Sequence, residues 1–465
     1  MSFFGRVNKF FGGDSKSEST AAYDTSDPHI IPRDNHVISR KNISNAALKV
    51  ITGLHNAGFE GFLVGGGVRD LLLDQHPKDF DVATDATPEQ VRSVFNNARI
   101  IGRRFKIVHV RYGREVIEVT TFRGNHQAKA HEQGKRPGNQ QSAKSHSGML
   151  LRDNVFGTVE EDAVRRDFTI NALYYTTSDF SVYDFTHGVR DLENKTIRII
   201  GDAQTRYKED PVRMLRAVRF AAKLDFTIEP GTAAPIKELA PLLSDIPAAR
   251  MFDEILKLFM AGHGEKTFKL MQEYNLFAPL FPETHHCLEQ PFAKDLIVQA
   301  LRNTDTRIHA GKPVTPAFIF AALLWPPTRM RHQQLLKERV PGIPAMHQAA
   351  QEVANRQQQF TSLPKRFGQP MREIWDLQLR LPKRNGNKAE QLVENKRFRA
   401  AYDFLLLRES AGEPTDGLGQ WWTDYQNRSP DQRELMIKSL PDSHQNKRRP
   451  KSRKRPKPQA NHESH

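Results

Sequence analysis

The apolar positions between residues 41 and 122 switch between helical spacing and strand-like runs. The helical spacing predicts one helix at about 43–57 and another from Pro88 to Phe95. Short runs rich in β-branched and aromatic residues predict four strands, at Phe62–Gly65, Phe80–Ala83, Ile107–Tyr112 and Val116–Thr121. Gly113 is expected to turn the last two strands into a hairpin. This stretch therefore predicts a small mixed β-sheet domain.

The pattern changes after about residue 200, where helical spacing replaces the strand signals. Met251, Ile255 and Phe259 recur at helical spacing, and similar segments separated by Pro and Gly continue to about residue 425. The predicted fold class is α+β, with a sheet domain followed by an all-helical part. We expect five regions: a disordered N-terminal arm (1–40), a head domain (41–200) with a mobile loop at 124–148, a helical neck (201–285), a helical body (286–430) and a disordered Arg/Lys-rich tail (431–465).

Composition limits the class and location of the protein. Hydrophobic residues make up 38% of the 465 residues, the mean hydropathy is −0.62, and no run reaches the roughly 18 apolar residues of a membrane span. An integral membrane protein is therefore excluded. The single cysteine, Cys287, cannot form an internal disulfide, and no secretory signal is visible, so we expect a cytoplasmic protein. Weak contact of the N-terminus with a membrane surface competes with simple disorder, because apolar residues recur there at helical spacing: Phe3, Phe4, Val7, Phe10 and Phe11.

The net charge of +15 predicts a polyanionic partner such as nucleic acid. Eight basic residues and one acidic residue lie between 447 and 465, so this tail carries about half of the net charge. Just before it, Trp421, Trp422 and Tyr425 could stack on bases, although such residues more often anchor a last helix in the core.

The segment 62–84 carries the clearest chemical signal. Gly65 and Gly66 at a strand-to-helix turn would let the backbone approach a phosphate, although a tight turn alone also explains them. Asp79 and Asp81 are expected on one face of the next strand, because strand side chains alternate. Two such carboxylates repel each other unless cations lie between them, and paired Mg²⁺ ions about 3.5 to 4 Å apart would relieve the repulsion. A solvated strand face is the alternative.

The combination of GGGVRD, which includes Arg69, with the following DFD resembles the nucleotidyltransferase superfamily of bacterial poly(A) polymerases and CCA-adding enzymes. The segment RRDFTINAL, from Arg165 to Leu173, resembles the second signature of that superfamily. Three segments resemble the bacterial poly(A) polymerase I family in particular, namely Leu150–Tyr175, Asn303–Trp325 and the basic C-terminus. No His-Asp dipeptide occurs, so the phosphohydrolase domain of some CCA-adding enzymes has no candidate here.

The resemblance implies a nucleotide site. Arg165 and Arg166 can neutralise a triphosphate, and the resemblance favours Arg166, while Asp167 and Asn171 would fix loops or a ribose hydroxyl. Arg123 is a further candidate phosphate contact. The full nucleotide-binding set that we expect is Gly65, Gly66, Arg69, Arg123, Arg166, Asp167, Asn171, Asp210 and Arg213.

Two questions about this site stay open in the sequence. A third metal-binding carboxylate is expected, and both Glu118, on a strand next to the aspartates, and Asp162, from a loop, are candidates, with a slight preference for Asp162. In the segment 206–224, which resembles the base-reading helix, Asp210 and Arg213 share one face and could read adenine. Asp210 before Pro211 is equally a good helix cap.

The resemblance implies template-independent addition of AMP from ATP to RNA 3′ ends, with Mg²⁺, or Mn²⁺ in its place, bound by carboxylates. Such tails would promote RNA decay, so RNA-decay proteins are candidate partners. A CCA-adding tRNA nucleotidyltransferase, which shares the catalytic residues, is one alternative. A non-catalytic RNA-binding protein with the same fold is the second.

Overall fold

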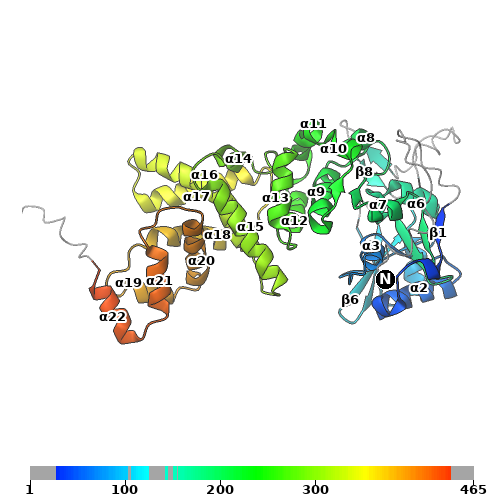
Figure 1. Cartoon of the computed structure of the whole chain (residues 1–465), viewed down its shortest axis with the longest axis horizontal. Coiled ribbons are helices and arrows are strands. Elements are labelled where there is room, and N and C mark those ends of the chain that lie inside the picture. Colours follow the sequence, from blue (N-terminus) through cyan, green and yellow to red (C-terminus); the bar gives the residue numbers. More distant parts are fainter. Residues whose placement is uncertain (1–27, 103–105, 125–141, 145–149, 154, 441–465) are drawn as a thin grey trace, which may run out of the picture.

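The computed structural model describes residues 28–102, 106–124, 142–144, 150–153 and 155–440. Over these ranges the molecule is elongated, with a β-sheet domain at one end and helices extending away from it (Figure 1). The predicted fold class, a mixed sheet followed by an all-helical part, is confirmed. Among the described residues, no helix is long and apolar enough to cross a membrane.

An eight-stranded sheet forms the head domain, in the order β1-β10-β9-β2-β3-β6-β5-β4. All neighbouring strands are antiparallel except β3 and β6, which run parallel. The strands are β1 (His29–Ile31), β2 (Phe62–Val64), β3 (Asp81–Thr84), β4 (Ala98–Ile101), β5 (Ile107–Tyr112), β6 (Glu115–Thr121), β9 (Leu173–Thr176) and β10 (Val182–Asp184). Two small pairs lie outside this sheet, β7 (Ser142–Lys144) with β8 (Leu150–Asp153) and β11 (Thr196–Ile197) with β12 (Thr227–Ile228).

Helices cover the sheet, and their ends follow local sequence signals. In α2 (Asn45–Asn56), the Ser44 hydroxyl accepts a hydrogen bond from the Ala47 N–H, and one apolar side of the helix packs on β3 and β6. In α4 (Pro88–Val94), Thr87 and Gln90 form a reciprocal capping box. The other head helices are α3 (Gly66–Leu72), α6 (Val159–Arg165) and α7 (Gly188–Glu193), with 3-10 turns at Arg33–Asn35, Arg40–Asn42 and Thr169–Asn171.

The chain after residue 200 is helical, as the spacing predicts, apart from the two-residue strand β12. The helices are α8 (Ala203–Glu209), α9 (Val212–Leu224), α10 (Pro230–Ala233), α11 (Ile236–Leu239), α12 (Ala248–Phe259), α13 (Gly264–Glu273), α14 (Pro282–Cys287), α15 (Ala293–His309), α16 (Pro316–Lys337), α17 (Gly342–Gln357), α18 (Lys365–Arg380), α19 (Lys388–Val393), α20 (Phe398–Ser410), α21 (Leu418–Gln426) and α22 (Pro430–Lys438), with a 3-10 turn at Ala240–Asp245. The division of this part into a neck and a body stays a prediction.

Two buried apolar clusters organise the molecule along its length. The larger one runs from the head through α9, α12 and α13 into α16–α18. A separate cluster joins the end of α18 to α19–α21, and its largest members are Trp422 and Tyr425, both 0% exposed. We call the unit formed by α19–α22 the C-terminal subdomain.

Each of the two ends that the sequence predicts to be disordered contains a strand or a helix among the described residues. Within the predicted arm, His29–Ile31 forms β1, which pairs with β10 and buries Ile31. Within the predicted tail, Pro430–Lys438 forms α22, which starts at a capping box between Ser429 and Gln432. These ends are predicted poorly because a short edge strand and a polar helix lack a sustained apolar period.

Two boundaries near the glycines also differ from the prediction. Helix α3 starts at Gly66, so of the two glycines expected at the turn only Gly65 lies before the helix. Strand β3 starts at Asp81, so the prediction that Asp79 lies on the strand is wrong, and Asp79 belongs to the connection before it. Most of the predicted loop at 124–148 lies outside the described residues, as does the Phe-rich N-terminus, although Ser142–Lys144 forms β7.

Candidate active site

Two carboxylates meet on the parallel strands at the centre of the sheet. Asp81 on β3 lies directly opposite Glu118 on β6, and residues opposite each other in register present their side chains on one face. Burial and the negative charges of Glu118 and Asp79 together raise the pKa of Asp81 to about 6, against a smaller opposing effect of Arg166. Asp81 therefore lies in a zone where Glu118 and Asp79 repel its charge.

The imidazole of His109 adds a polar partner to this zone. On β5, His109 lies opposite Glu118, and its Nε2 is 3.3 Å from a carboxylate oxygen of Glu118. Nothing in the sequence marks this histidine, because the pairing depends on the register of β5 and β6. Among the described residues, no three His, Cys, Asp or Glu side chains stand close enough together to form a closed metal site.

Asp162, the other candidate for the third carboxylate, is a buried hydrogen-bonding centre. Its Oδ2 accepts from Arg166 Nε (3.2 Å) and Nη2 (2.9 Å) and from the Tyr174 hydroxyl (2.7 Å). Its Oδ1 accepts from the Arg123 backbone N–H (3.1 Å). Both oxygens are thus already used within the protein, and Asp162 fixes the position of Arg166.

Arg166 is held between this carboxylate and the glycine turn. Burial alone would lower its pKa, but Tyr174 and Asp162 keep the pKa above its usual value, so the guanidinium stays charged. Gly65 has a φ of 71°, and a Cβ placed there would lie 3.5 Å from Arg166 Nη1. The positive φ is therefore the reason for glycine here, because a Cβ would make only an ordinary contact with this arginine.

An arginine cluster lies beside Arg166 at the junction of the head and the first helices after it. Burial, together with the charges of neighbouring arginines, lowers the pKa of Arg165 and of Arg206 to about 10 each. For Arg165 these neighbours include Arg123, and for Arg206 the first is Arg213. Arg206 Nη2 also donates to the carbonyls of Arg165 (2.7 Å) and Arg166 (2.6 Å). So many close positive charges favour a multiply charged anion.

Three of the predicted nucleotide-binding residues are tied to one another. Arg69 Nη1 donates to Asn171 Oδ1 (2.7 Å), and Asn171 Nδ2 donates to Asp167 Oδ1 (3.3 Å). Asp167 Oδ2 pairs with Arg216 of α9 at 2.5 Å. Burial would raise the pKa of Asp167, but Arg216 and Asn171 hold it below its usual value. This chain of contacts fastens α3 and the turn at Thr169–Asn171 to α9.

The predicted base-reading pair lies at the start of α9, where the two side chains have different partners. Asp210 Oδ2 pairs with Arg250 Nη2 of α12 (2.9 Å), and Asp210 Oδ1 is 3.4 Å from the Val212 N–H. Arg213 Nη1 donates to the Arg206 carbonyl (2.8 Å). The capping contact of Asp210 is thus long, and its main partner is Arg250. The sequence carries no signal for Arg250 or for Tyr174.

Comparisons with known proteins agree with this geometry. Family models match as "Poly A polymerase head domain" (61–198), "Probable RNA and SrmB- binding site of polymerase A" (225–288) and "Polymerase A arginine-rich C-terminus" (338–456). Poly(A) polymerase I of Salmonella typhimurium is 48% identical over 454 residues, which are 96% of each chain. A CCA-adding enzyme of Lactobacillus helveticus is 38% identical over 230 residues, covering 50% of this chain and 53% of that one.

A solved structure shares the fold. The crystal structure of the Bacillus stearothermophilus CCA-adding enzyme in complex with CTP has a TM-score of 0.53 and 26% identity, covering 82% of this chain and 81% of that chain. A mixed sheet with clustered carboxylates beside an arginine cluster, followed by helices, defines a nucleotidyltransferase. Within this class, the chain belongs to the bacterial poly(A) polymerase I family.

Proposed function

We propose that the protein adds AMP from ATP to the 3′ ends of RNA without a nucleic-acid template. The observation that carries this proposal is the placement of Asp81 and Glu118 side by side, with Asp79 near them, next to the arginines around Arg166. Membership in the poly(A) polymerase I family supports the choice of ATP and RNA as substrates.

Asp79, Asp81 and Glu118 are the proposed ligands of Mg²⁺, and binding would draw their side chains together, because no group of three such side chains is arranged to hold a metal ion among the described residues. Carboxylate oxygens suit this ion, and a cation would remove the repulsion that raises the pKa of Asp81. When bound, the metal supplies charge that lowers the pKa of the RNA 3′-hydroxyl and neutralises the triphosphate. Glu118 is preferred to Asp162 as the third ligand, because the oxygens of Asp162 already accept hydrogen bonds from Arg123, Arg166 and Tyr174.

The remaining site residues bind and orient the substrates. Arg166, charged and fixed by Asp162, together with Arg123 and Arg165, is proposed to hold the triphosphate and to stabilise the departing pyrophosphate. Arg213 and Asp210 are proposed to read adenine, with Arg250 holding the Asp210 carboxylate in place. Gly65 and Gly66 leave room for the phosphates beside the turn, and Arg69, Asp167 and Asn171 fix that turn against α9.

The cellular role follows from this chemistry as a further proposal. Repeated adenylate addition gives a poly(A) tail, which would mark RNA for decay, and the region 225–288 is a candidate contact for RNA or for a decay protein. The single cysteine, buried Cys287, is consistent with work in the reducing cytoplasm.

The deciding experiment supplies each nucleoside triphosphate separately, with Mg²⁺ and an unstructured RNA primer, and resolves the products by length. A long ladder with ATP alone is the expected result. Addition of only one to three nucleotides, with CTP required before ATP and tRNA-like ends preferred, would show a CCA-adding enzyme. The similarity to the Lactobacillus CCA-adding enzyme makes this the alternative to test. Asp81→Asn should reduce incorporation by at least about 100-fold, equivalent to about 2.7 kcal/mol, with an unchanged circular dichroism spectrum. Equal activity of this variant would contradict the assignment.

A further inference from the structure

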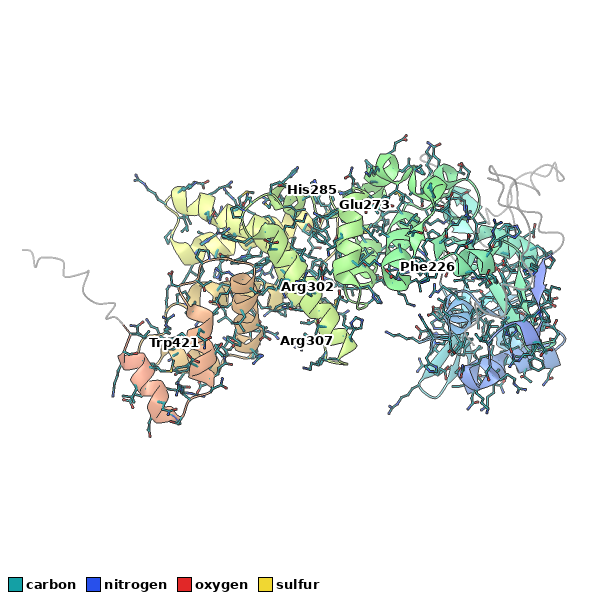
Figure 2. All side chains as sticks on the ribbon, viewed as in Figure 1. Phe226, Glu273, His285, Arg302, Arg307 and Trp421 are labelled. Atoms are coloured by element: carbon teal, nitrogen blue, oxygen red, sulfur yellow. The ribbon has the colours of Figure 1, made fainter. Side chains whose placement is uncertain are left out.

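Two aromatic rings and two guanidinium groups form a four-layer stack in the C-terminal subdomain and in the connection between α18 and α19 that precedes it. The Trp421 and Tyr425 rings of α21 stack with centroids 4.8 Å apart and planes 15° from parallel. The Arg384 guanidinium lies over Trp421 at 4.7 Å from the ring centroid, and the Arg433 guanidinium lies over Tyr425 at 5.3 Å. Because one ring face cannot hold two groups at these distances, the order is Arg384, Trp421, Tyr425, Arg433. Figure 2 labels Trp421 at the end of the molecule opposite the sheet domain.

The two outer arginines of this stack differ in their partners. Arg433 is fully engaged, since it donates to the carbonyls of Tyr425 (3.0 Å) and Gln426 (3.1 Å) and to Glu390 (3.4 Å). Arg384 has no hydrogen bond or ion pair to any residue that the structure describes, and its buried Nε has no acceptor. Burial lowers the pKa of Arg384, and no acidic neighbour opposes this shift. The stack thus ends at Arg384 in a partly exposed cation that lacks an anion.

Trp421 differs in the same way from the other tryptophans. Trp325, Trp375 and Trp422 are 5%, 0% and 0% exposed, and Trp375 and Trp422 donate their ring N–H groups to carbonyls in the core. Trp422 and Tyr425 therefore anchor the core, which is the more ordinary of the two sequence predictions for them. Trp421 is only partly buried, and one face of its ring packs against the Arg384 guanidinium.

We propose that Arg384 and Trp421 form a subsite for an unpaired nucleotide of single-stranded RNA, upstream of the 3′ end that reacts. The edge of the Arg384 guanidinium donates to a backbone phosphate, and its outer face continues the stack with a base. This inference rests on the RNA substrate proposed above. It favours RNA over an acidic polypeptide because a flat stacked surface suits a base, and because the basic run 447–457 follows this subdomain in the chain.

Tryptophan fluorescence during titration with oligoadenylates of increasing length tests the subsite directly. Long oligoadenylate should change the fluorescence of the wild-type protein, and Trp421→Phe should remove the change while keeping affinity, because phenylalanine preserves the stack. Arg384→Gln should weaken binding of long RNA by about tenfold, within the range of about 1–3 kcal/mol for one stacked base. It should also reduce the slope of log affinity against log salt by about 0.7 for the lost phosphate contact.

The matched control is Lys337→Gln, which removes one exposed positive charge from the end of α16. It should keep the fluorescence change and lower affinity by less than about twofold. Loss of the same affinity in Lys337→Gln as in Arg384→Gln would overturn the subsite, as would an equal fluorescence change with polyglutamate. Wild-type AMP addition to a short primer is measured in parallel. If that addition occurs without any fluorescence response to long RNA, the subsite alone fails; if addition is absent, the proposed function fails.

Discussion

Replacing Asp162 by Asn should destabilise the head domain without removing a metal ligand. The substitution replaces Oδ2, which accepts two hydrogen bonds from Arg166 and one from Tyr174, by an amide or a neutral oxygen. The Asp162 and Arg166 side chains are only 9% and 22% exposed, so the arginine would keep a poorly solvated charge without its partner. Breaking such a buried pair costs about 3–5 kcal/mol. Because Arg166 retains some solvent contact, we expect a loss of about 3 kcal/mol in the free energy of unfolding.

Glu118→Gln should show the opposite behaviour. Its side chain is 49% exposed and lies 3.3 Å from the half-buried His109 ring, so the expected loss of stability is below about 1 kcal/mol. Binding of Mn²⁺, followed by electron paramagnetic resonance as a stand-in for Mg²⁺, should weaken by at least about tenfold in Glu118→Gln. In Asp162→Asn, the folded protein should still bind Mn²⁺.

The assay combines urea denaturation, followed by circular dichroism, with the Mn²⁺ titration. Glu89→Gln is the control, because it removes a carboxylate of α4 that is 62% exposed and paired with Lys106. It should change stability by less than about 1 kcal/mol and leave Mn²⁺ binding intact. Our assignment would be refuted by an Asp162→Asn protein of normal stability that has lost Mn²⁺ binding, or by a Glu118→Gln protein that binds Mn²⁺ normally.

Three further predictions concern pH, base selection and the tail. The folded-state pKa of Asp81 is raised to about 6, so its neutral form stabilises the metal-free protein at low pH. This contribution is lost as the pH rises through about 6. Mn²⁺ binding needs the charged form of Asp81, so the affinity for Mn²⁺ should decrease at pH values below about 6. Asp81→Asn should abolish this part of the pH dependence in calorimetric unfolding. Arg250→Gln should raise the KM for ATP by about tenfold and increase misincorporation of CTP in primer extension, since Asp210 loses its partner. Deleting 447–465 should flatten the salt slope of RNA binding by about 0.7 for each lost phosphate contact, and an unchanged slope would contradict this role of the tail.

Local sequence signals were sufficient for the fold class and for the longer elements. The helical spacing of α2 and the capping signals of α4 lie within a few residues of each other, so they can be read without tertiary contacts. The sequence analysis does not predict the strands β1, β9 and β10, although they are as short as β2 and β3, which it does predict. Strand order was also beyond the sequence, since the neighbours β2 and β9 are far apart in the chain.

The motifs supply candidate site residues, but they do not show which of these residues contact each other. The sequence alone slightly favours Asp162 over Glu118, and the parallel register of β3 and β6, which places Glu118 opposite Asp81, is not visible in it. The position of Asp79 before the strand depends on where β3 begins to pair, which is a tertiary property. Arg250 and Tyr174 have no motif of their own, because each acts through a single contact to a motif residue.

The proposed triphosphate and base contacts meet at the junction between the sheet and the first helices after it. The Arg206 side chain of α8 donates to the backbone carbonyls of Arg165 and Arg166, at the end of the helix that leads to the proposed triphosphate contact, Arg166. The same Arg206 offers its own carbonyl to Arg213, the proposed adenine reader. Arg206 thus links the proposed triphosphate and base contacts, through its side chain on one side and its backbone carbonyl on the other. Changes in α8 should therefore alter affinity for the whole nucleotide, whereas changes at Arg250 should act mainly on the choice of base.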